Sequence, residues 1–590
     1  MDLMSRALDA FDEYRRLGVT RFVQSAVVID NEAEMHARLS APSRPSGPAA
    51  RTGASLLNPP VMTDPNAEPV ARRTIADDDA GAEPSHELDA KMLTDAWSER
   101  EVICGLYRPE PGEDMVRLAT KAAAHADVVI LDWFLERASS VKARQIIVEI
   151  LKSDLKDKGR LRLLAVYTSQ AGISGIAKEV FDAVEEAAEL KKRLTLDGAV
   201  LTGPSIRICI LSKKQTPGSS DVDKVDESLL PKRLIEEFSR LSTGLLTTFA
   251  LHSIAAVRRS AHHVVAVFRE ELDGAYVGHR CSIDDPDNAR EFAVDLIVGE
   301  LRNVIAVDEM AEGCMTETVL DAWVDQLAGE AGFTVQEEVK APSAVVKGLV
   351  RGGAGALKAV GGSLVDRSAK QVGGTIKFEN VGWLFYRKPD DAWNSHLEFA
   401  RLSSFKREAF GRTQLPVGFR PTLTLGSVLK LLGPINEADQ AKYAGLSGYY
   451  VCMQPRCDSV RLEQLQAFPF QTAEAAPGPF NLVVKERGLD SGTPLMVSGK
   501  LSELVLFKFK PDQGAKVVKA EQREDGFIFT DDLEREFLWL GDIRDLKAQQ
   551  DASALAASVH RVGLDEHEWL RRAARKETKI NFRPTSLGST

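Results

Sequence analysis

Four apolar stretches of this chain end in residues that together suit phosphoryl transfer. Asp132 follows one such stretch directly, and the ends of the others carry Asp30-Asn31-Glu32, Thr168, and Lys213-Lys214. A carboxylate can accept a phosphoryl group if a divalent cation neutralises the developing charge. Acidic neighbours hold Mg²⁺ together with water, while a hydroxyl and an ammonium group contact the phosphoryl oxygens. Asp132 is therefore where a reactive carboxylate would be placed, and the set of residues as a whole is chemically coherent with phosphoryl transfer.

The stretches that precede these residues read as buried strands. Continuous apolar runs, rather than alternating ones, are typical of parallel strands that are covered on both faces. Ligands of such sheets bind at the carboxyl ends of the strands. We expect strands near 22–29, 102–107, 128–131, 161–167 and 206–211, with helices between them and a hairpin-like stretch before the last strand. This alternation predicts a five-stranded, doubly wound parallel sheet with helices on both faces.

Residues 33–85 interrupt this pattern. They are rich in Pro, Ala, Ser, Asp and Gly, a composition that cannot bury a core. We predict a long flexible insertion here. The simplest interpretation of the polar strand ends is also structural, because Thr168-Ser169 would serve equally well as the cap of a following helix.

Composition narrows the class of protein. With 590 residues, the chain is long enough for several domains. Its net charge of −11 argues against a general affinity for nucleic acid. No apolar run is long enough to cross a membrane, and the 6 scattered cysteines do not form a disulfide framework, so we expect a cytoplasmic protein.

Taken together, residues of about 20 to 240 resemble a response-regulator receiver domain, which has a flavodoxin-like fold. The resemblance rests on the order of the strands and on the residues at their ends. It implies that Asp132 is phosphorylated by a histidine kinase, that Asp30 belongs to the metal-binding acidic pair, and that Thr168 is the switch hydroxyl. Lys213 is the implied phosphate-binding lysine, with Lys214 an equal contender.

The chain also departs from the receiver pattern. The second acid of the pair is replaced by the neutral Asn31, for which Glu32 could compensate. Lys213 is followed by Lys214 and Gln215 rather than by proline, and the insertion begins directly after the acidic loop. Two interpretations stay open: an Mg²⁺-dependent phosphorylated switch, or a degenerate receiver that acts only as a protein-binding platform. Divergent receivers of this kind occur in large bacterial proteins of phage-defence or other conflict systems, often with an ATPase or kinase partner.

Two other classes of protein fit less well. An aspartyl-phosphate phosphatase of the haloacid-dehalogenase type normally needs a second aspartate two residues after the nucleophile, and Phe134 stands there. A transcription factor should show a helix-turn-helix after the receiver, and none is evident. We therefore expect a signal-transducing or scaffolding protein without a catalytic effector domain.

The remaining chain suggests regulation and assembly. We divide the sequence into a receiver-like domain (1–224), a helical domain (225–339), a small-residue hinge or linker (340–375), a β-rich domain (376–545), and C-terminal helices with a tail (546–590). Apolar residues recur at helical spacing over 225–272, which suggests a pair of helices that could form a homodimer.

The β-rich domain has the pattern of a small barrel or sandwich, with candidate strands near 375–378, 381–386, 449–453, 480–484 and 504–509. Its most distinctive segment contains Cys452 and Cys457, but no second ligand pair for zinc stands nearby. We predict instead a polar turn that serves as an interaction site, with Cys457, Asp458 and Arg461 as its candidate residues.

Overall fold

The computed structural model describes residues 2–33 and most of 88–559. Within the second range it leaves out 111–113, 137–138, 157–158, 221–222, 284–286, 314, 329–332, 337–338, 358–363, 366–370, 373–375, 377–380, 387–388, 412–414, 417, 435–436, 447 and 490. Apart from Ala33, the predicted insertion at 33–85 thus lies outside the described residues, as does the tail beyond 559. The chain divides into unit 1 (1–265 and 300–326) and unit 2 (266–299 and 327–590). Among the described helices, none combines the length and apolar character needed to cross a bilayer.

Unit 1 is built on an eight-stranded mixed sheet. Its parallel part has the order β2-β1-β3-β4-β7. These strands span Ser25–Ile29 (β1), Ile103–Tyr107 (β2), Val128–Leu131 (β3), Arg162–Thr168 (β4) and Ile206–Lys213 (β7). The sheet is larger than the five strands predicted. A hairpin of β5 (Thr195–Asp197) and β6 (Val200–Thr202) adds antiparallel to β7, and β8 (Lys224–Val225) pairs with the end of β7.

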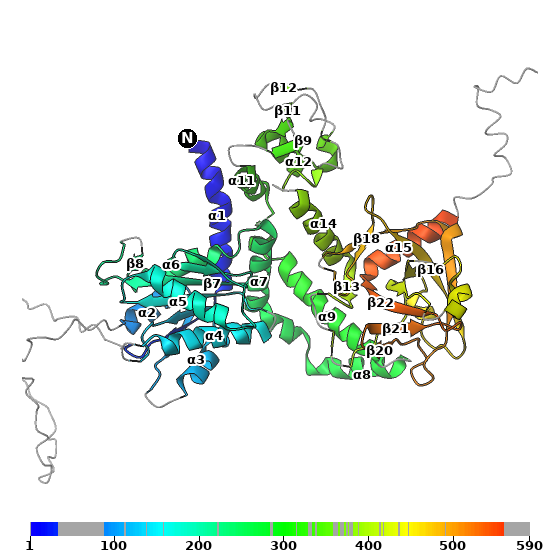
Figure 1. Cartoon of the computed structure of the whole chain (residues 1–590), viewed down its shortest axis with the longest axis horizontal. Coiled ribbons are helices and arrows are strands. Elements are labelled where there is room, and N and C mark those ends of the chain that lie inside the picture. The colour runs from blue at the N-terminus through cyan, green and yellow to red at the C-terminus, as the bar shows by residue number, and fades with distance from the viewer. Residues whose placement is uncertain are drawn as a thin grey trace, which may run out of the picture. The chain divides into compact units, whose positions relative to one another are not determined.

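Helices cover both faces of this sheet (Figure 1). One face packs on α3 (Met115–Ala123), α4 (Val141–Lys156) and α5 (Ile173–Glu186). The other packs on α1 (Asp2–Phe22), α2 (Ala90–Ser98) and α6 (Leu230–Ser239). Alternate residues of β3 enter the two cores, which is why every residue of this strand is apolar.

The predicted helical region continues after α6. It contains α7 (Leu245–Val267), η1 (Glu270–Leu272), α8 (Asp273–Ser282), α9 (Asp287–Ala306), α10 (Glu309–Gly313) and α11 (Glu317–Ala328). Leu234 and Phe238 of α6 and Leu251 of α7 are buried in the core of unit 1. Several apolar positions that suggested a homodimer are therefore already packed within one chain.

A buried histidine links α1 and α7. The ring of His252 lies 3.0 Å from the carbonyl of Tyr14 through Nε2 and 3.1 Å from Arg21 through Nδ1. Burial lowers the pKa of His252, and the neighbouring Arg21 acts in the same direction. The folded chain thus binds a proton at this site less readily than the unfolded chain does.

We expect this histidine to make unit 1 acid-sensitive. Folding lowers the pKa of His252. The contribution of the neutral ring to stability is therefore fully present above the pKa of the unfolded chain, about 6.5, and is lost as the pH falls through the pKa of the folded chain. A His252→Gln variant lacks this titrating ring. Its free energy of unfolding should therefore fall less than that of the wild type between about pH 7.5 and pH 5, the range in which histidines usually titrate. Urea unfolding at both pH values measures this, and an equal loss in both proteins would contradict the prediction.

Unit 2 contains a ten-stranded antiparallel sheet. Its strands are β13 (Phe405–Glu408), β14 (Ser427–Leu431), β15 (Tyr449–Cys452), β16 (Gln466–Ala475), β17 (Leu482–Val484), β18 (Thr493–Val497), β19 (Leu504–Phe509), β20 (Glu521–Arg523), β21 (Gly526–Thr530) and β22 (Glu536–Ile543). Short 3-10 helices interrupt it: η3 (Glu437–Tyr443), η4 (Arg456–Asp458) and η5 (Leu501–Glu503). α14 (Pro389–Ser404) precedes the sheet and α15 (Asp545–Val559) follows it.

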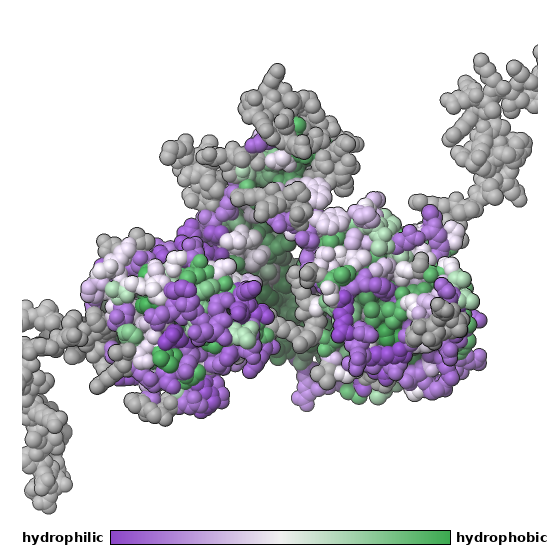
Figure 2. Space-filling view, in the orientation of Figure 1, coloured by the Kyte–Doolittle hydropathy of each residue, from purple (hydrophilic) through white to green (hydrophobic). Residues whose placement is uncertain are grey.

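Part of this sheet curls around an aromatic core. The strands run in the order β19-β16-β15-β14-β22-β21, and a bridge between Phe509 and Asp531 brings the two ends of this series together. The side chains inside are Tyr450, Phe468, Phe470, Phe507, Phe509, Phe529, Phe537 and Trp539. Neighbouring residues on the same strands, such as Val451 and Leu540, point to the other face, where α15 packs. In Figure 2 the visible side of unit 2 carries a hydrophobic area framed by hydrophilic residues.

One segment differs from the element expected for it, and another contains short strands that were not predicted. Residues 381–386 form mainly a turn rather than a strand, because Trp383 and Tyr386 pack against His396 of α14 instead of joining a sheet. Residues 340–375, expected to form a small-residue helix, hinge or linker, contain α12 (Ser343–Ala356) and parts of a four-stranded sheet. That small sheet comprises β9 (Phe333–Gln336), β10 (Val339–Ala341), β11 (Leu364–Val365) and β12 (Gln371–Val372).

Candidate functional site

Three charged side chains meet at the carboxyl ends of the parallel strands. Asp30 follows β1, Asp132 follows β3, and Lys213 ends β7. The Lys213 Nζ lies 3.5 Å from Asp30 Oδ2 and 3.5 Å from Asp132 Oδ1. Lys213 thus reaches past the end of β4, which lies between β3 and β7, to join two carboxylates that are far apart in the sequence.

Burial gives this cluster its electrostatic character. Asp30 is only 3% exposed and Lys213 only 7% exposed. Burial raises the pKa of the Asp132 carboxyl to about 6, with Lys213 opposing the shift and Asp30 adding to it. Burial also works against the charge of Lys213, but Asp132 and Asp30 outweigh it and leave the pKa of Lys213 above its usual value. Two carboxylates thus share one ammonium group in a buried place, and a bound cation would stabilise the charged form of both.

Each carboxylate is also fixed by its own loop. The Asp30 Oδ1 accepts a 2.7 Å hydrogen bond from the backbone N–H of Glu32, and the Asp132 Oδ2 accepts one of 2.8 Å from that of Phe134. Each side chain caps the turn that follows its strand, so its other oxygen faces Lys213. The backbone N–H of Asp132 donates to the carbonyl of Ile29 at 2.9 Å, which keeps the two loops side by side.

Two hydroxyl groups lie close to the carboxyl ends of β4 and β7. Thr168 is buried at the end of β4, and its Oγ1 accepts a 3.1 Å hydrogen bond from the backbone N–H of Gln170. The Thr216 Oγ1 lies 2.7 Å from the carbonyl of Lys213 and 3.3 Å from that of Thr168. The sequence interpretation did not include Thr216, whose only signal was a hydroxyl three residues after a candidate lysine.

The other sequence-predicted residues occupy different surroundings. Lys214 is exposed and forms a 2.8 Å ion pair with Asp226, so Lys213 is the lysine that lies between the carboxylates. Glu32 is exposed. Asn31 is half-buried, and its Oδ1 is buried without a hydrogen-bond partner among the described residues.

The donor atoms at this edge suit Mg²⁺ better than a transition metal. Within the described ranges, no group of three or more His, Cys, Asp or Glu side chains is placed to hold a metal ion. Mg²⁺, however, usually binds through one or two carboxylates and keeps several waters. Asp30 and Asp132 are two carboxylates at this end of the strands, and the Oδ1 of Asn31, which has no hydrogen-bond partner among the described residues, would be a further oxygen donor.

Phe134 occupies the position that a phosphatase of the alternative class would use for its general acid. Its side chain is partly buried and packs against the core that contains α3, α4 and α5. A phenyl ring cannot donate a proton, so the described site has no acid at this position.

The candidate interaction residues of unit 2 lie on one turn between β15 and β16. Cys457 and Asp458 belong to η4 and are exposed, as is Arg461. Cys452, by contrast, is buried in β15, where burial raises the pKa of its thiol to about 12. The neighbouring Arg456 pairs with Asp545 at the start of α15, which anchors the turn.

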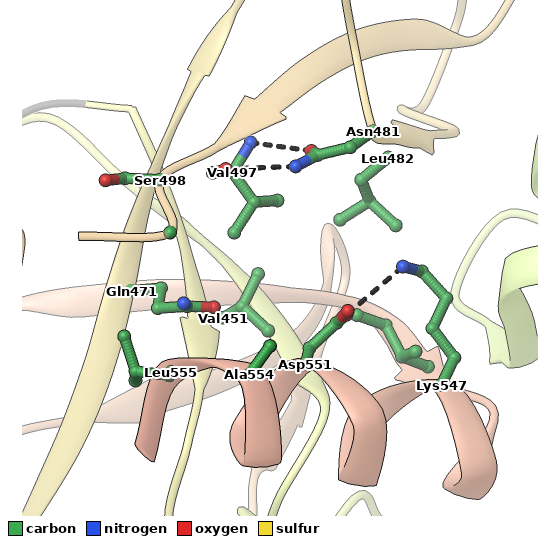
Figure 3. Close-up of a pocket in the computed structure, with 12 residues that line it drawn as sticks. Val451, Gln471, Asn481, Leu482, Val497, Ser498, Lys547, Asp551, Ala554 and Leu555 are labelled. Atoms are coloured by element: carbon green, nitrogen blue, oxygen red, sulfur yellow. Dashed lines mark hydrogen bonds and ion pairs between the residues drawn. The ribbon is translucent and has the colours of Figure 1, made fainter. Parts of the chain in front are cut away.

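Unit 2 also contains a cavity of about 160 Å³ between its sheet and α15 (Figure 3). Asn481 bonds the backbone of Val497 through both atoms of its amide, at 3.0 and 2.8 Å. Lys547 pairs with Asp551 along α15 at 3.1 Å. The first interaction joins the segment before β17 to the end of β18, and the second lies within α15, so these polar groups are satisfied on their own sides of the cavity.

The comparison with protein families adds to this geometry. Residues 22–218 match the family of the response receiver domain. This part of the chain is thus similar to response receiver domains, and its parallel sheet with helices on both faces fits their fold. The match begins just before β1 and ends just after Lys213, so it includes Asp30, Asp132 and Thr168. The comparisons with curated proteins and with solved structures found no match.

Proposed function

We propose that this protein is a cytoplasmic signalling or scaffolding protein whose receiver domain accepts a phosphoryl group at Asp132. The observation that carries the proposal is the meeting of Asp30, Asp132 and Lys213 at one sheet edge, with Lys213 Nζ at 3.5 Å from both carboxylates. The partner proposed is a protein, such as a histidine kinase or an ATPase. A place in a bacterial phage-defence or conflict system is supported by the family resemblance alone.

The chemistry follows from these side chains. An Asp132 carboxylate oxygen forms a bond to phosphorus while the bond from phosphorus to a donor nitrogen breaks, and the nitrogen keeps the electron pair and takes up a proton. Asp30, Asp132 and Asn31 would hold Mg²⁺, which neutralises charge on the phosphoryl oxygens. Lys213 exchanges its contact with Asp132 for one with a phosphoryl oxygen. The Thr168 hydroxyl, one strand away, would then reorient toward the new charge.

A degenerate receiver is the second candidate function. The neutral Asn31 in place of an acid weakens the metal site, and this observation favours a domain that binds partners without being phosphorylated. The two candidates make opposite predictions about phosphoryl uptake.

Phosphoryl uptake is tested by intact mass of the full chain after treatment with acetyl phosphate and Mg²⁺ or with candidate kinases. We expect a gain of one phosphoryl group in the wild type and none in Asp132→Asn, which lacks the nucleophilic oxygen pair. Asp197→Asn, on the hairpin of the same sheet, is the matched control and should gain mass normally. A wild-type protein that takes up no phosphoryl group from any donor would contradict phosphorylation at Asp132 and favour the binding-platform alternative.

A further inference from the structure

Strand β2 forms one edge of the sheet in unit 1. On one side it pairs in parallel with β1. The N–H of Ile103 donates to the carbonyl of Gln24, and the carbonyl of Tyr107 accepts from the N–H of Asp30. Backbone groups alternate along a strand, so those of Cys104 and Leu106 point to the other side. There, β2 has no partner strand among the described residues.

This edge lacks the features that usually prevent strands from associating. Charged residues, prolines, bulges and short length are the common ones. β2 has five residues without charge or proline, and its register with β1 is continuous. Ile103 is 79% exposed. The hairpin at the opposite end of the sheet, by contrast, ends in a three-residue strand that carries Asp197.

We propose that β2 pairs antiparallel with β2 of a second copy of this chain, with the two-fold axis at Gly105. In this register Cys104 of one copy and Leu106 of the other exchange both of their backbone hydrogen bonds, and symmetry repeats the exchange. Gly105 of one copy lies opposite Gly105 of the other, and these two residues form no backbone hydrogen bonds with each other. The pairing satisfies every backbone group that β2 presents at its edge.

The residues around β2 favour a second copy in this orientation. Glu101 lies just before the strand and Arg108 just after it, and both are exposed. Antiparallel copies place Glu101 of one near Arg108 of the other at both ends, whereas parallel copies would place like charges together. Ile103 also comes to lie beside Tyr107 of the second copy, which covers its exposed side chain. The surface is thus complementary to itself, as an isologous interface requires.

A cysteine at the two-fold axis tests the pairing. A Cβ on Gly105 would meet only the carbonyl oxygen of Ala26 at 3.9 Å and a Val27 methyl at 4.0 Å, so Gly105→Cys should fold normally. Facing residues of an antiparallel pair without hydrogen bonds lie about 4.5 Å apart between Cα atoms, within disulfide range. Thr195→Cys, exposed on the opposite hairpin, is the matched control.

We expect oxidation of full-length Gly105→Cys to give several-fold more covalent dimer than the wild type or Thr195→Cys, with the link mapped between the two substituted positions. Wild-type Cys104 faces Leu106 in this register and should not link to itself. Ile103→Asp, at an exposed position, should abolish dimers in sedimentation equilibrium. Linkage no higher than in Thr195→Cys would overturn the proposal, and so would a dimer that survives Ile103→Asp. An edge that receives a strand of another protein instead of a second copy would give the first of these results.

Discussion

Replacing Asn31 with aspartate is expected to strengthen Mg²⁺ binding by about tenfold to a hundredfold, because a full charge is added beside the metal. The Oδ1 of Asn31 is buried without a partner among the described residues, and it follows Asp30 directly. An amide oxygen offers the metal a dipole, whereas a carboxylate offers a charge. Calorimetric titration of the wild type and of Asn31→Asp with Mg²⁺ measures the difference.

The same substitution should have an opposite effect on the metal-free protein. A third carboxylate beside Asp30 and Asp132 adds repulsion that Lys213 alone does not balance, so the melting temperature in EDTA should fall. Mg²⁺ should then restore more stability to Asn31→Asp than to the wild type. Glu32→Gln, at an exposed neighbouring position, is the control and should leave the affinity nearly unchanged. Equal Mg²⁺ affinities for wild type and Asn31→Asp would remove Asn31 from the proposed site.

Gly541→Ala should destabilise unit 2 by about 3 kcal/mol, at the upper end of the usual cost of overpacking. Gly541 lies in β22, opposite Glu408 of β13 and Val428 of β14, and the register with β14 shifts directly after Val428. A Cβ there would overlap the carbonyl oxygen of Arg407 and the ring of Phe405. Backbone cannot move aside as a flexible side chain can, so the strands themselves must separate.

Urea unfolding followed by tryptophan fluorescence measures this cost, since Trp539 lies two residues away in the same strand. Gly478→Ala is the control: a Cβ on Gly478 would meet no atom within 4 Å, so its effect should stay within about 0.5 kcal/mol. A Gly541→Ala protein as stable as Gly478→Ala would show that β13 does not pack against β22 as closely as described.

The polar residues at the carboxyl ends of the parallel strands could be predicted from the sequence, because continuous apolar runs identify strands that are buried on both faces. Strands of that kind end at a common edge, so the polar residues that follow them can be placed together without a structure. Asp30, Asp132 and Lys213 are brought together in this way. The same reasoning did not distinguish Lys213 from Lys214, since either could follow the strand.

The point at which the strand ends made that choice. β7 is buried through its last residue, Lys213, whereas Lys214 lies beyond the strand and is exposed, where it pairs with Asp226. Thr216 was missed for a related reason. Its hydroxyl contacts the carbonyls of Lys213 and Thr168, and a contact with backbone leaves no trace in the pattern of residue types.

The β-rich part shows the larger gap between sequence and structure. Runs of apolar and aromatic residues indicated strands near 449–453 and 504–509, where β15 and β19 lie. They could not indicate that β19 pairs with β16, or that the Phe509–Asp531 bridge brings the series of strands together around the aromatic core. Local pattern determines which residues are extended and which side of a strand is apolar. Only the tertiary structure decides which strands meet, because pairing depends on backbone hydrogen bonds between segments distant in the chain, and all residues except proline offer the same backbone groups.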